Sequence, residues 1–310
     1  MEKKFIGIDG GGTKTEFVLF AENGHILGRL LLGACNPNTV GMEKTLEVLK
    51  EGIDTLAGTE HKISGVFVGA AGLDVPENGN RVLDTLGKLY PDVKTTIGND
   101  IYNVFGCGVK QHAKIAAICG TGVIVFAKNG DNLKRFAGRG FLFDEGGSGF
   151  HIGRDAINAV VDVYDGFKER SILTDLVEEQ IGGDVWSNFN KLYSSGQSYI
   201  ASFTPCVVKA YEKGDEVAGE ILRKNAKYLA GYINDAAKLI DGPTTVVASG
   251  SIFTKTTAVC DILNDELDKK LTLYIPDAPP VFGACVMCAE ANGVSTDGLC
   301  DNFMDDYNKL

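Results

Sequence analysis

The sequence predicts an α/β protein of two domains, each with a mixed β-sheet flanked by helices. Its 310 residues exceed one minimal domain and suit roughly two, with a cleft between them. The predicted elements begin as strands and continue as alternating strands and helices, which indicates a mixed sheet. The same pattern starts again near residue 114. With 44% apolar and 23% charged residues, the chain can bury a sizeable core.

The first predicted domain covers residues 1–112. Three segments rich in Ile, Leu, Val and Phe are separated by glycine-containing turns, which predicts an antiparallel meander. Helical spacing of apolar residues follows, and then strands and helices alternate. In order, we expect strands at 4–9, 16–20 and 26–32, a helix at 39–56, a strand at 66–68, a helix at 81–89, a strand at 93–97 and a helix that begins at Ile101.

The second predicted domain covers residues 113–310 and repeats the architecture of the first. A strand ends in a Gly-Thr-Gly turn and reverses at once into another strand, as happens near the start of the chain. No low-complexity linker lies near residue 112, so we expect a hinge there, with the last helix free to pack back on the first domain. The expected elements include strands at 115–119, 123–127, 133–136, 245–248 and 271–275, and helices at 215–240, 254–267 and 281–291.

The charge balance argues against nucleic acid as a partner. Lys and Arg total 30 against 41 Asp and Glu, a net charge of −11, which opposes contact with a phosphate backbone. No apolar run is long enough for a secretory signal or a membrane span, so we expect a cytoplasmic protein with no membrane partner. The eight cysteines lie mostly in apolar surroundings, and we expect buried thiols rather than disulfides.

A glycine-rich turn follows the first predicted strand. Consecutive glycines let backbone N–H groups surround an anion, and threonine and lysine side chains add donors and charge. Asp9, at the strand end, is suited to hold the water shell of a magnesium ion that accompanies a nucleotide. The alternative is a plain hairpin turn. The predicted phosphate-binding residues are Gly10, Gly11, Gly12, Thr13, Lys14 and Thr15.

Two later glycine turns suggest further contacts to the same nucleotide. Gly120, Thr121 and Gly122 repeat the first turn in the second half of the chain. Gly250 and Ser251 follow a buried strand and precede a helix, a position at which backbone approaches an anion or a flat ligand such as adenine. Taken singly, each of these turns also suits an ordinary connection between elements.

Taken in order, five segments resemble the N-acetylglucosamine kinase family. They are the turn at 9–15, the dipeptide Asn99-Asp100, the turn at 120–122, the segment 138–149 and the dipeptide Ser249-Gly250. That family belongs to the actin, heat-shock chaperone and sugar-kinase superfamily. It is grouped with the ATPases that activate benzoyl-CoA reductase and 2-hydroxyacyl-CoA dehydratase. The resemblance implies two actin-like (ribonuclease H-like) domains around a central cleft, with ATP and Mg²⁺ as cofactors.

The resemblance also implies the sugar-binding residues. Asp100 matches the family's catalytic aspartate, and its place after a strand puts it at the sheet edge where ligands bind. A carboxylate there could accept the proton of the sugar hydroxyl, although it could instead only cap the next helix. Asn36 matches an asparagine that holds sugar hydroxyls, and Ala71 and Gly72 match a loop that lines the sugar pocket. Ordinary turns are the competing explanation for both of these segments.

The segment 138–149 departs from the family pattern at two places. Arg139 stands between Gly138 and Gly140 where the family usually has tryptophan, which makes an anionic sugar conceivable. The acidic pair is shifted by one residue. The carboxylate that contacts the sugar is therefore either Asp144 or Glu145.

The implied activity is ATP-dependent phosphorylation of the 6-hydroxyl of an amino sugar. N-acetylglucosamine is the first candidate, and glucosamine and N-acetylmuramic acid are alternatives. The rival is an ATPase that activates a radical 2-hydroxyacyl-CoA dehydratase or benzoyl-CoA reductase, which needs cluster-binding cysteines such as Cys285 and Cys288. Those two cysteines lie in an apolar helical segment and suit a core better. The number of subunits is open, with a homodimer as one option.

Overall fold

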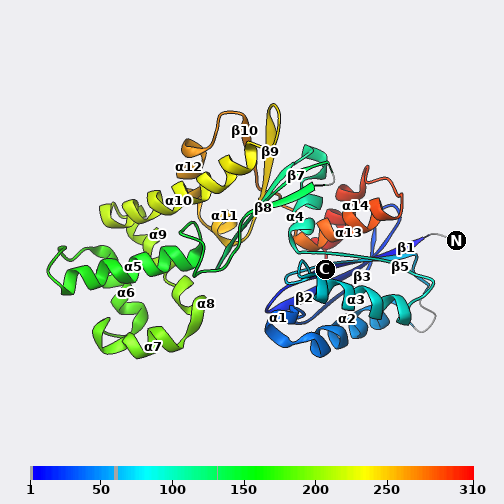
Figure 1. Ribbon diagram of the computed structural model, residues 1–310, viewed down its shortest axis with the longest axis horizontal. Coiled ribbons are helices and arrows are strands. Elements are labelled where there is room, and N and C mark those ends of the chain that lie inside the picture. Colours follow the sequence, from blue (N-terminus) through cyan, green and yellow to red (C-terminus); the bar gives the residue numbers. More distant parts are fainter. Residues whose placement is uncertain (1–2, 59–61, 131) are drawn as a thin grey trace. The chain divides into compact units, whose positions relative to one another are not determined.

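The computed structural model describes residues 3–58, 62–130 and 132–310, which form two compact units (Figure 1). The first unit comprises residues 1–112 and 276–310, and the second comprises residues 113–275. The sequence predicts a second domain at residues 113–310, with the last helix free to pack back on the first domain. In the structure the chain returns to the first unit after Ile275, and the final 35 residues complete its fold.

The first unit is built on a five-stranded mixed sheet. The three strands nearest the N-terminus form an antiparallel meander, and two further strands add in parallel beside β1. Parallel pairing aligns Asp9 at the end of β1 with Gly69 at the end of β4. The strand order is β3 (Ile26–Gly33), β2 (Lys14–Ala21), β1 (Lys4–Gly10), β4 (Gly65–Ala70) and β5 (Lys94–Gly98).

Helices cover both faces of this sheet (Figure 1). On one face, α2 (Met42–Ala57) packs on β2 and β3, and α3 (Pro76–Leu89) packs on β5. On the other face, α13 (Pro280–Ala291) packs on β1 and against α4 (Ile101–Cys107). The remaining helical segments of this unit are α1 (Pro37–Val40), η1 (Val109–Gln111) and α14 (Leu299–Tyr307).

The second unit repeats the topology of the first sheet. Its β6 pairs antiparallel with β7 and parallel with β9, as β1 pairs with β2 and β4. Both units therefore have a meander followed by two parallel strands, and both carry a glycine turn between the first two strands. The strand order is β10 (Leu271–Tyr274), β9 (Thr244–Ser249), β6 (Ile115–Cys119), β7 (Val123–Asn129) and β8 (Asn132–Ala137).

A long helix and a group of shorter helices complete the second unit. The long helix α10 (Glu216–Ala237) packs on β6, β7 and β8 and is in turn contacted by α12 (Thr257–Glu266). A capping box at Ser171 starts α6 by satisfying backbone N–H groups that the first helical turn leaves free. The other segments are α5 (Gly149–Tyr164), α6 (Ile172–Ile181), η2 (Trp186–Asn188), α7 (Phe189–Ser194), α8 (Gly196–Ala201), α9 (Thr204–Glu212) and α11 (Ser251–Lys255).

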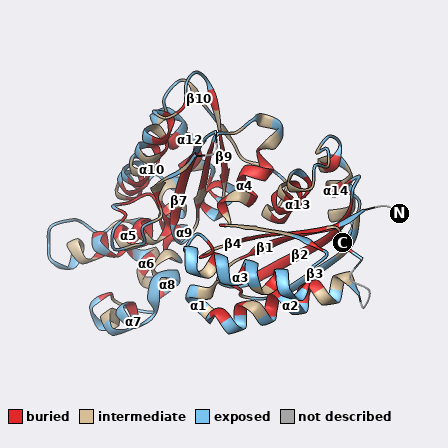
Figure 2. Cartoon of the chain, turned by 45° about the vertical axis from the view of Figure 1, so that its right-hand side comes forward, coloured by how far each residue is buried: buried red, intermediate tan, exposed pale blue. Residues whose placement is uncertain are grey.

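Each unit buries its own apolar core around its sheet. In the first unit, Phe17 is fully buried together with Ile6 and Ile8, and the apolar side of α2 packs over them. Gly52 allows this approach, because a Cβ there would lie 2.3 Å from the Phe17 ring. Phe5 and Phe20 are also fully buried, with their ring centroids 5.5 Å apart. Figure 2 shows the central strands buried and the outer faces of α2 and α3 exposed. The period-2 and period-3.6 patterns of the sequence thus correspond to the buried faces.

Three differences from the expected elements are larger than a shift of a helix end by a few residues. The helix expected at 39–56 is interrupted at Gly41, whose φ of +80° ends α1 before α2 begins. The helix expected at 254–267 is two helices, because Thr256 has a non-helical φ of −140° between α11 and α12. Helix α14 was not predicted from the sequence. All three changes lie outside the sheets, whose strands the sequence located to within a few residues.

Candidate active site

The turn between β1 and β2 presents exposed backbone at the sheet edge. The Gly11 N–H donates to the Lys14 carbonyl at 3.0 Å and closes the turn. Gly12 and Thr13 are exposed, and among the described residues no backbone hydrogen bond uses their N–H groups. Thr15 differs from the expectation, because it is fully buried and its hydroxyl donates to the Gly33 carbonyl at 2.7 Å. The turn thus has backbone N–H groups that can bind an anion, whereas the Thr15 side chain stabilises the pairing of β2 with β3.

The flanking residues of this turn are held by close contacts. Gly10 is buried, and a Cβ at this position would lie 2.3 Å from Cys35 Sγ. The Gly10 carbonyl accepts from the Ala71 N–H at 3.0 Å, which joins the turn to the loop after β4. Lys14 is exposed beside the turn. Glycine at position 10 is therefore required by packing, and the adjacent strands fix where the turn begins.

Asp9 carries a strongly perturbed carboxyl group. Burial raises its pKa from the ordinary 3.8 to about 7, and the negative charges of Asp100 and Glu16 act in the same direction. The hydrogen bond from Asn103 Nδ2 to Asp9 Oδ1, at 2.5 Å, and the charge of Lys14 lower it. Carboxylates gathered in this way suit a cation. Among the described residues no three His, Cys, Asp or Glu side chains form a metal site by themselves.

Asp100 stands at the carboxyl end of β5 and begins α4. Its side chain makes no capping hydrogen bond to that helix. The neighbouring Asn99 supplies the bond instead, because its Oδ1 accepts from the Ile101 N–H at 3.1 Å. Asn99 Nδ2 in turn donates to Asp74 Oδ1 at 3.1 Å. The structure therefore assigns helix capping to Asn99, and it places the Asp100 carboxylate near Asp9.

Amide side chains gather where the loop after β4 meets the start of α1. Asn36 Oδ1 accepts from the Asn38 N–H at 2.9 Å and caps α1, and a Cβ on Gly72 would lie 2.7 Å from the same oxygen. Asn78 Nδ2 donates to the Gly72 carbonyl at 3.1 Å. The structure thus brings together the predicted residues Asn36 and Gly72. It also places Asn38 and Asn78 in this group, and no pattern in the sequence marks these two asparagines as neighbours of Asn36 and Gly72.

In the second unit, the turn at 120–122 lies against the start of α5. The Gly120 N–H donates to the Gly122 carbonyl at 2.9 Å, and the Gly120 carbonyl accepts from the Gly149 N–H at 2.8 Å. Thr121 is exposed, with no backbone bond to its own N–H among the described residues. Gly250, with φ of +103°, passes so close to Cys119 that a Cβ would lie 2.3 Å from the Cys119 carbonyl oxygen.

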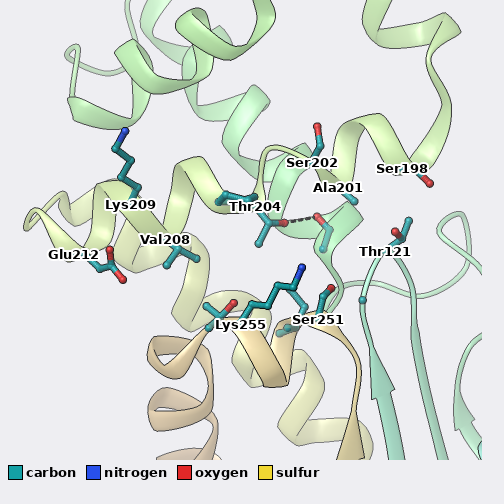
Figure 3. A pocket seen from close by; sticks show the side chains of 15 residues that line it. Thr121, Ser198, Ala201, Ser202, Thr204, Val208, Lys209, Glu212, Ser251 and Lys255 are labelled. Carbon is teal, nitrogen blue, oxygen red and sulfur yellow. Dashed lines mark hydrogen bonds between the residues drawn. The ribbon is translucent and has the colours of Figure 1, made fainter. Parts of the chain in front are cut away.

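These turns border a cavity of about 670 Å³ within the second unit (Figure 3). Thr121 and Ser251 both line it, so the two turns from which they come border one cavity. Figure 3 shows Ser251 and Lys255 on α11 facing Thr204 on α9. Thr204 is held by its bond to the Gly149 carbonyl at 3.0 Å. The wall made by α8 and α9 was not predicted from the sequence. It includes Ser198, Ser202, Lys209 and Glu212.

The loop between β8 and α5 is organised around Asp144. Its carboxylate, 3% exposed, accepts from the backbone N–H groups of Gly138, Arg139 and Gly140 at 2.8 to 3.3 Å. Gly138 and Gly140 have φ of +100° and +94°, values that favour glycine and turn these N–H groups to one point. Glu145, in contrast, is exposed. Of the two carboxylates that the sequence left open, Asp144 folds the loop and Glu145 faces solvent.

A buried histidine connects this loop to α5. His151 Nδ1 lies 2.7 Å from Ser148 Oγ, and Nε2 lies 2.9 Å from the Asp144 carbonyl oxygen. Because Nε2 must donate to that carbonyl, the ring's other nitrogen accepts from the serine hydroxyl when the histidine is neutral. Burial lowers the pKa of His151, with Arg154 acting in the same direction. The histidine thus links the loop to α5.

The two cysteines considered for a cluster lie inside the first unit. Cys285 and Cys288 are fully buried on α13. Burial raises the pKa of Cys288 to about 12 and that of Cys285 well above its ordinary range. Gly7 of β1 lies directly against Cys285, since a Cβ there would be 2.6 Å from its Sγ. All eight cysteines are free thiols.

A family model matches this arrangement along most of the chain. Residues 6–287 match the BadF/BadG/BcrA/BcrD ATPase family. The chain belongs to this family. The matched segment contains both glycine turns, Asp100 and the loop at 138–145. The family's description is that of ATPases, which agrees with the nucleotide-binding turns predicted from the sequence.

Two curated relatives of this chain are named as sugar kinases. An N-acetylmuramic acid/N-acetylglucosamine kinase of Clostridium acetobutylicum is 30% identical over 288 residues, 88% of this chain and 92% of the relative. An N-acetyl-D-glucosamine kinase of Dictyostelium discoideum is 28% identical over 304 residues, 91% of this chain and 94% of the relative. Both alignments extend across the two units.

Solved structures share the fold. A Chromobacterium violaceum protein proposed to be an N-acetylglucosamine kinase superposes with a TM-score of 0.70 at 20% identity, covering 92% of this chain and 98% of that one. A ROK family glucokinase of Streptomyces griseus, in complex with glucose and AMPPNP, gives 0.59 at 17% identity over 93% and 99%. The predicted actin-like, two-domain fold is thereby confirmed. Across the described residues, none of the helices has the length and apolar character that a membrane crossing needs.

Proposed function

We propose that this protein is an ATP-dependent kinase that phosphorylates the 6-hydroxyl of an amino sugar, with N-acetylglucosamine as the first candidate. The curated relatives that match nearly its whole length are kinases of N-acetylglucosamine, and one of them also acts on N-acetylmuramic acid. A third relative, 26% identical over 72% of this chain, is a glucosamine kinase of Vibrio cholerae. Amino sugars are the substrates that these three names share.

The observation that carries the mechanism is the pair of carboxylates at the carboxyl edge of the first sheet. Asn99 rather than Asp100 caps α4, and Asp100 stands at the carboxyl end of β5, where a carboxylate is suited to accept the proton of a sugar hydroxyl. As the proton moves to Asp100, the hydroxyl oxygen forms a bond to the γ-phosphorus and the bond to ADP breaks. Asn36 and the loop at Gly72, gathered nearby in the same unit, would hold the sugar.

The second unit would hold the nucleotide. Its cavity of about 670 Å³ is large enough for a nucleoside, and Lys255 provides a cation beside Ser251. The exposed backbone of Thr121 would supply an N–H donor to a phosphate oxygen, and Gly12 and Thr13 present donors of the same kind within the first unit.

Magnesium fits the charge arrangement around Asp9. Mg²⁺ is commonly held by one or two carboxylates together with substrate phosphates, so a complete protein cage is unnecessary. Asp9 lies beside two further carboxylates, Asp100 and Glu16, and a divalent cation would neutralise their repulsion. When bound, the ion would neutralise charge on the transferring phosphoryl group. Asp9 would hold it, in part through water.

The redox-activator alternative receives no support from the cysteines. A cluster shared between subunits needs thiolates at a surface, whereas Cys285 and Cys288 are fully buried within the first unit. Burial also raises both thiol pKa values, which disfavours the thiolate form that binds metal.

A coupled assay of ADP release tests the proposed function. Glucosamine, N-acetylglucosamine, N-acetylmannosamine and N-acetylmuramic acid are compared at equal concentration, together with 6-deoxy-N-acetylglucosamine. We expect sugar-dependent ADP release with at least one amino sugar and none with the 6-deoxy compound. The absence of sugar-dependent release from the whole set would refute the proposal, and release of ADP alongside an unmodified sugar would indicate an ATPase.

A further inference from the structure

We infer that Asn103 is a positioning residue that holds the Asp9 carboxylate in the orientation used for magnesium, an inference that rests on the proposed function. Asn103 lies on α4, one turn after Asp100, and its side chain is fully buried. Its Nδ2 donates to Asp9 Oδ1 at 2.5 Å and to the Gly69 carbonyl at 2.9 Å. Asp9 and Gly69 are paired neighbours on β1 and β4, so one amide fixes the ends of both strands.

The orientation of this amide follows from its partners. A carboxylate and a carbonyl can only accept, so the group between them must be the NH₂ and not the oxygen. The hydrogen bond from Asn103 Nδ2 occupies Asp9 Oδ1. Among the described residues, no hydrogen bond occupies Asp9 Oδ2. The arrangement therefore leaves one carboxylate oxygen for a metal ion or its water.

Glycines on the neighbouring elements let their backbone approach Asn103 closely. A Cβ at Gly69 would lie 1.8 Å from Asn103 Oδ1, so the amide occupies space that any other residue would fill. Helix α13 also packs closely against α4, because a Cβ at Gly283 would lie 1.7 Å from the Asn103 carbonyl oxygen. The Asn103 N–H also donates to the Asp100 carbonyl at 3.0 Å. Helix α4 thus contacts both aspartates: the Asn103 side chain binds the Asp9 carboxylate, and the Asn103 N–H binds the Asp100 carbonyl.

A purely structural role explains this residue less well. Asn103 Oδ1 is buried with no hydrogen-bond partner among the described residues. Burying an amide oxygen in this way costs solvation that the two donor bonds only partly offset. For packing alone, an apolar side chain of the same volume would serve at least as well. What an apolar residue could not supply is the donor to Asp9. Residues that orient metal ligands in this way commonly change metal affinity 10- to 100-fold when they are replaced.

The test compares Asn103→Leu with the parent by calorimetric titration of ATP, once with Mg²⁺ and once with EDTA. We expect the gain in ATP affinity on adding Mg²⁺ to fall roughly 10- to 100-fold in the variant, with the affinity in EDTA unchanged. The Mg²⁺ concentration for half-maximal turnover should rise by a similar factor. Val104→Ala is the matched control, because Val104 is equally buried on the same helix. It should lose stability but keep the parent's response to Mg²⁺.

Asn103→Ser, which is smaller, is the second variant should the leucine variant not fold, and the same loss is expected. The inference is overturned if either folded Asn103 variant keeps the full response to Mg²⁺, or if the parent itself shows none. Failure of the proposed function is separate from both outcomes. It would appear as absent sugar-dependent ADP release in a parent whose nucleotide binding still responds to Mg²⁺.

Discussion

Replacement of Asp9 by asparagine should stabilise the fold while abolishing phosphoryl transfer. The carboxyl group is held among buried atoms and two like charges, which raises its pKa to about 7 from 3.8. Asparagine has nearly the same shape and can still accept the bond from Asn103 Nδ2. The variant therefore removes an unfavourable charge without opening a cavity. It also removes the proposed contact to magnesium.

The sign and size of the effect follow from the two pKa values. Below pH 3.8 the group is protonated in both folded and unfolded chains, and it does not affect the free energy of unfolding. As pH rises from 3.8 to about 7, the unfolded chain loses its proton first, so the parent becomes less stable. The resulting loss in the free energy of unfolding is about 4 kcal/mol at pH 8, where it is complete, and about 2 kcal/mol at pH 5.

Thermal unfolding of parent and Asp9→Asn, measured in EDTA at pH 5 and pH 8, tests this reasoning. We expect the variant to melt several degrees higher at pH 8, with a clearly smaller advantage at pH 5. Asp92→Asn, at an exposed carboxylate of the same unit, is the control and should show no pH-dependent advantage. An Asp9→Asn variant that is less stable at pH 8, or whose advantage does not change with pH, would refute the argument.

Two further predictions concern the second unit. Asp144→Asn removes the negative charge that accepts hydrogen bonds from three loop N–H groups. We expect faster proteolysis at the exposed Phe143, a higher KM for the sugar and a Tm lowered by a few degrees. An unchanged proteolysis rate would contradict this role of Asp144. Lys255→Met removes the cation beside the cavity, and KM for ATP should rise roughly tenfold. The exposed Lys213, outside the cavity, gives the control Lys213→Met, and equal KM values for the two lysine variants would contradict the assignment.

The strands and glycine turns could be predicted from the sequence because their signals are local. Alternating and continuous apolar runs located both meanders, and Gly-Thr turns marked the reversals. The parallel strands placed Asp9 and Asp100 at one edge, since parallel strands share the direction of their carboxyl ends. Residue-level patterns were thus sufficient for the first sheet and for its acidic residues.

The remaining features depend on contacts between distant segments. Asn103 is one turn beyond Asp100, yet its role is visible only when β1 and β4 bring Asp9 and Gly69 to its amide. The roles of Asp144 and Glu145 could not be separated from their order in the chain, because the difference arises from the positive φ of Gly138 and Gly140. The return of residues 276–310 to the first unit likewise depends on contacts with distant segments, such as the packing of α13 on β1 and α4.

The most direct test of the account is the turnover of Asp100→Asn with N-acetylglucosamine, or with the amino sugar that the screen finds best. Dissociation constants for ATP and the sugar are measured alongside, and phosphorus NMR identifies the product of the parent. We predict a 6-phosphate from the parent and a kcat reduced about 100- to 10,000-fold in the variant, with both ligands bound within a few-fold of the parent. A variant that retains near-parental kcat, or a parent that phosphorylates a different hydroxyl, would contradict the account.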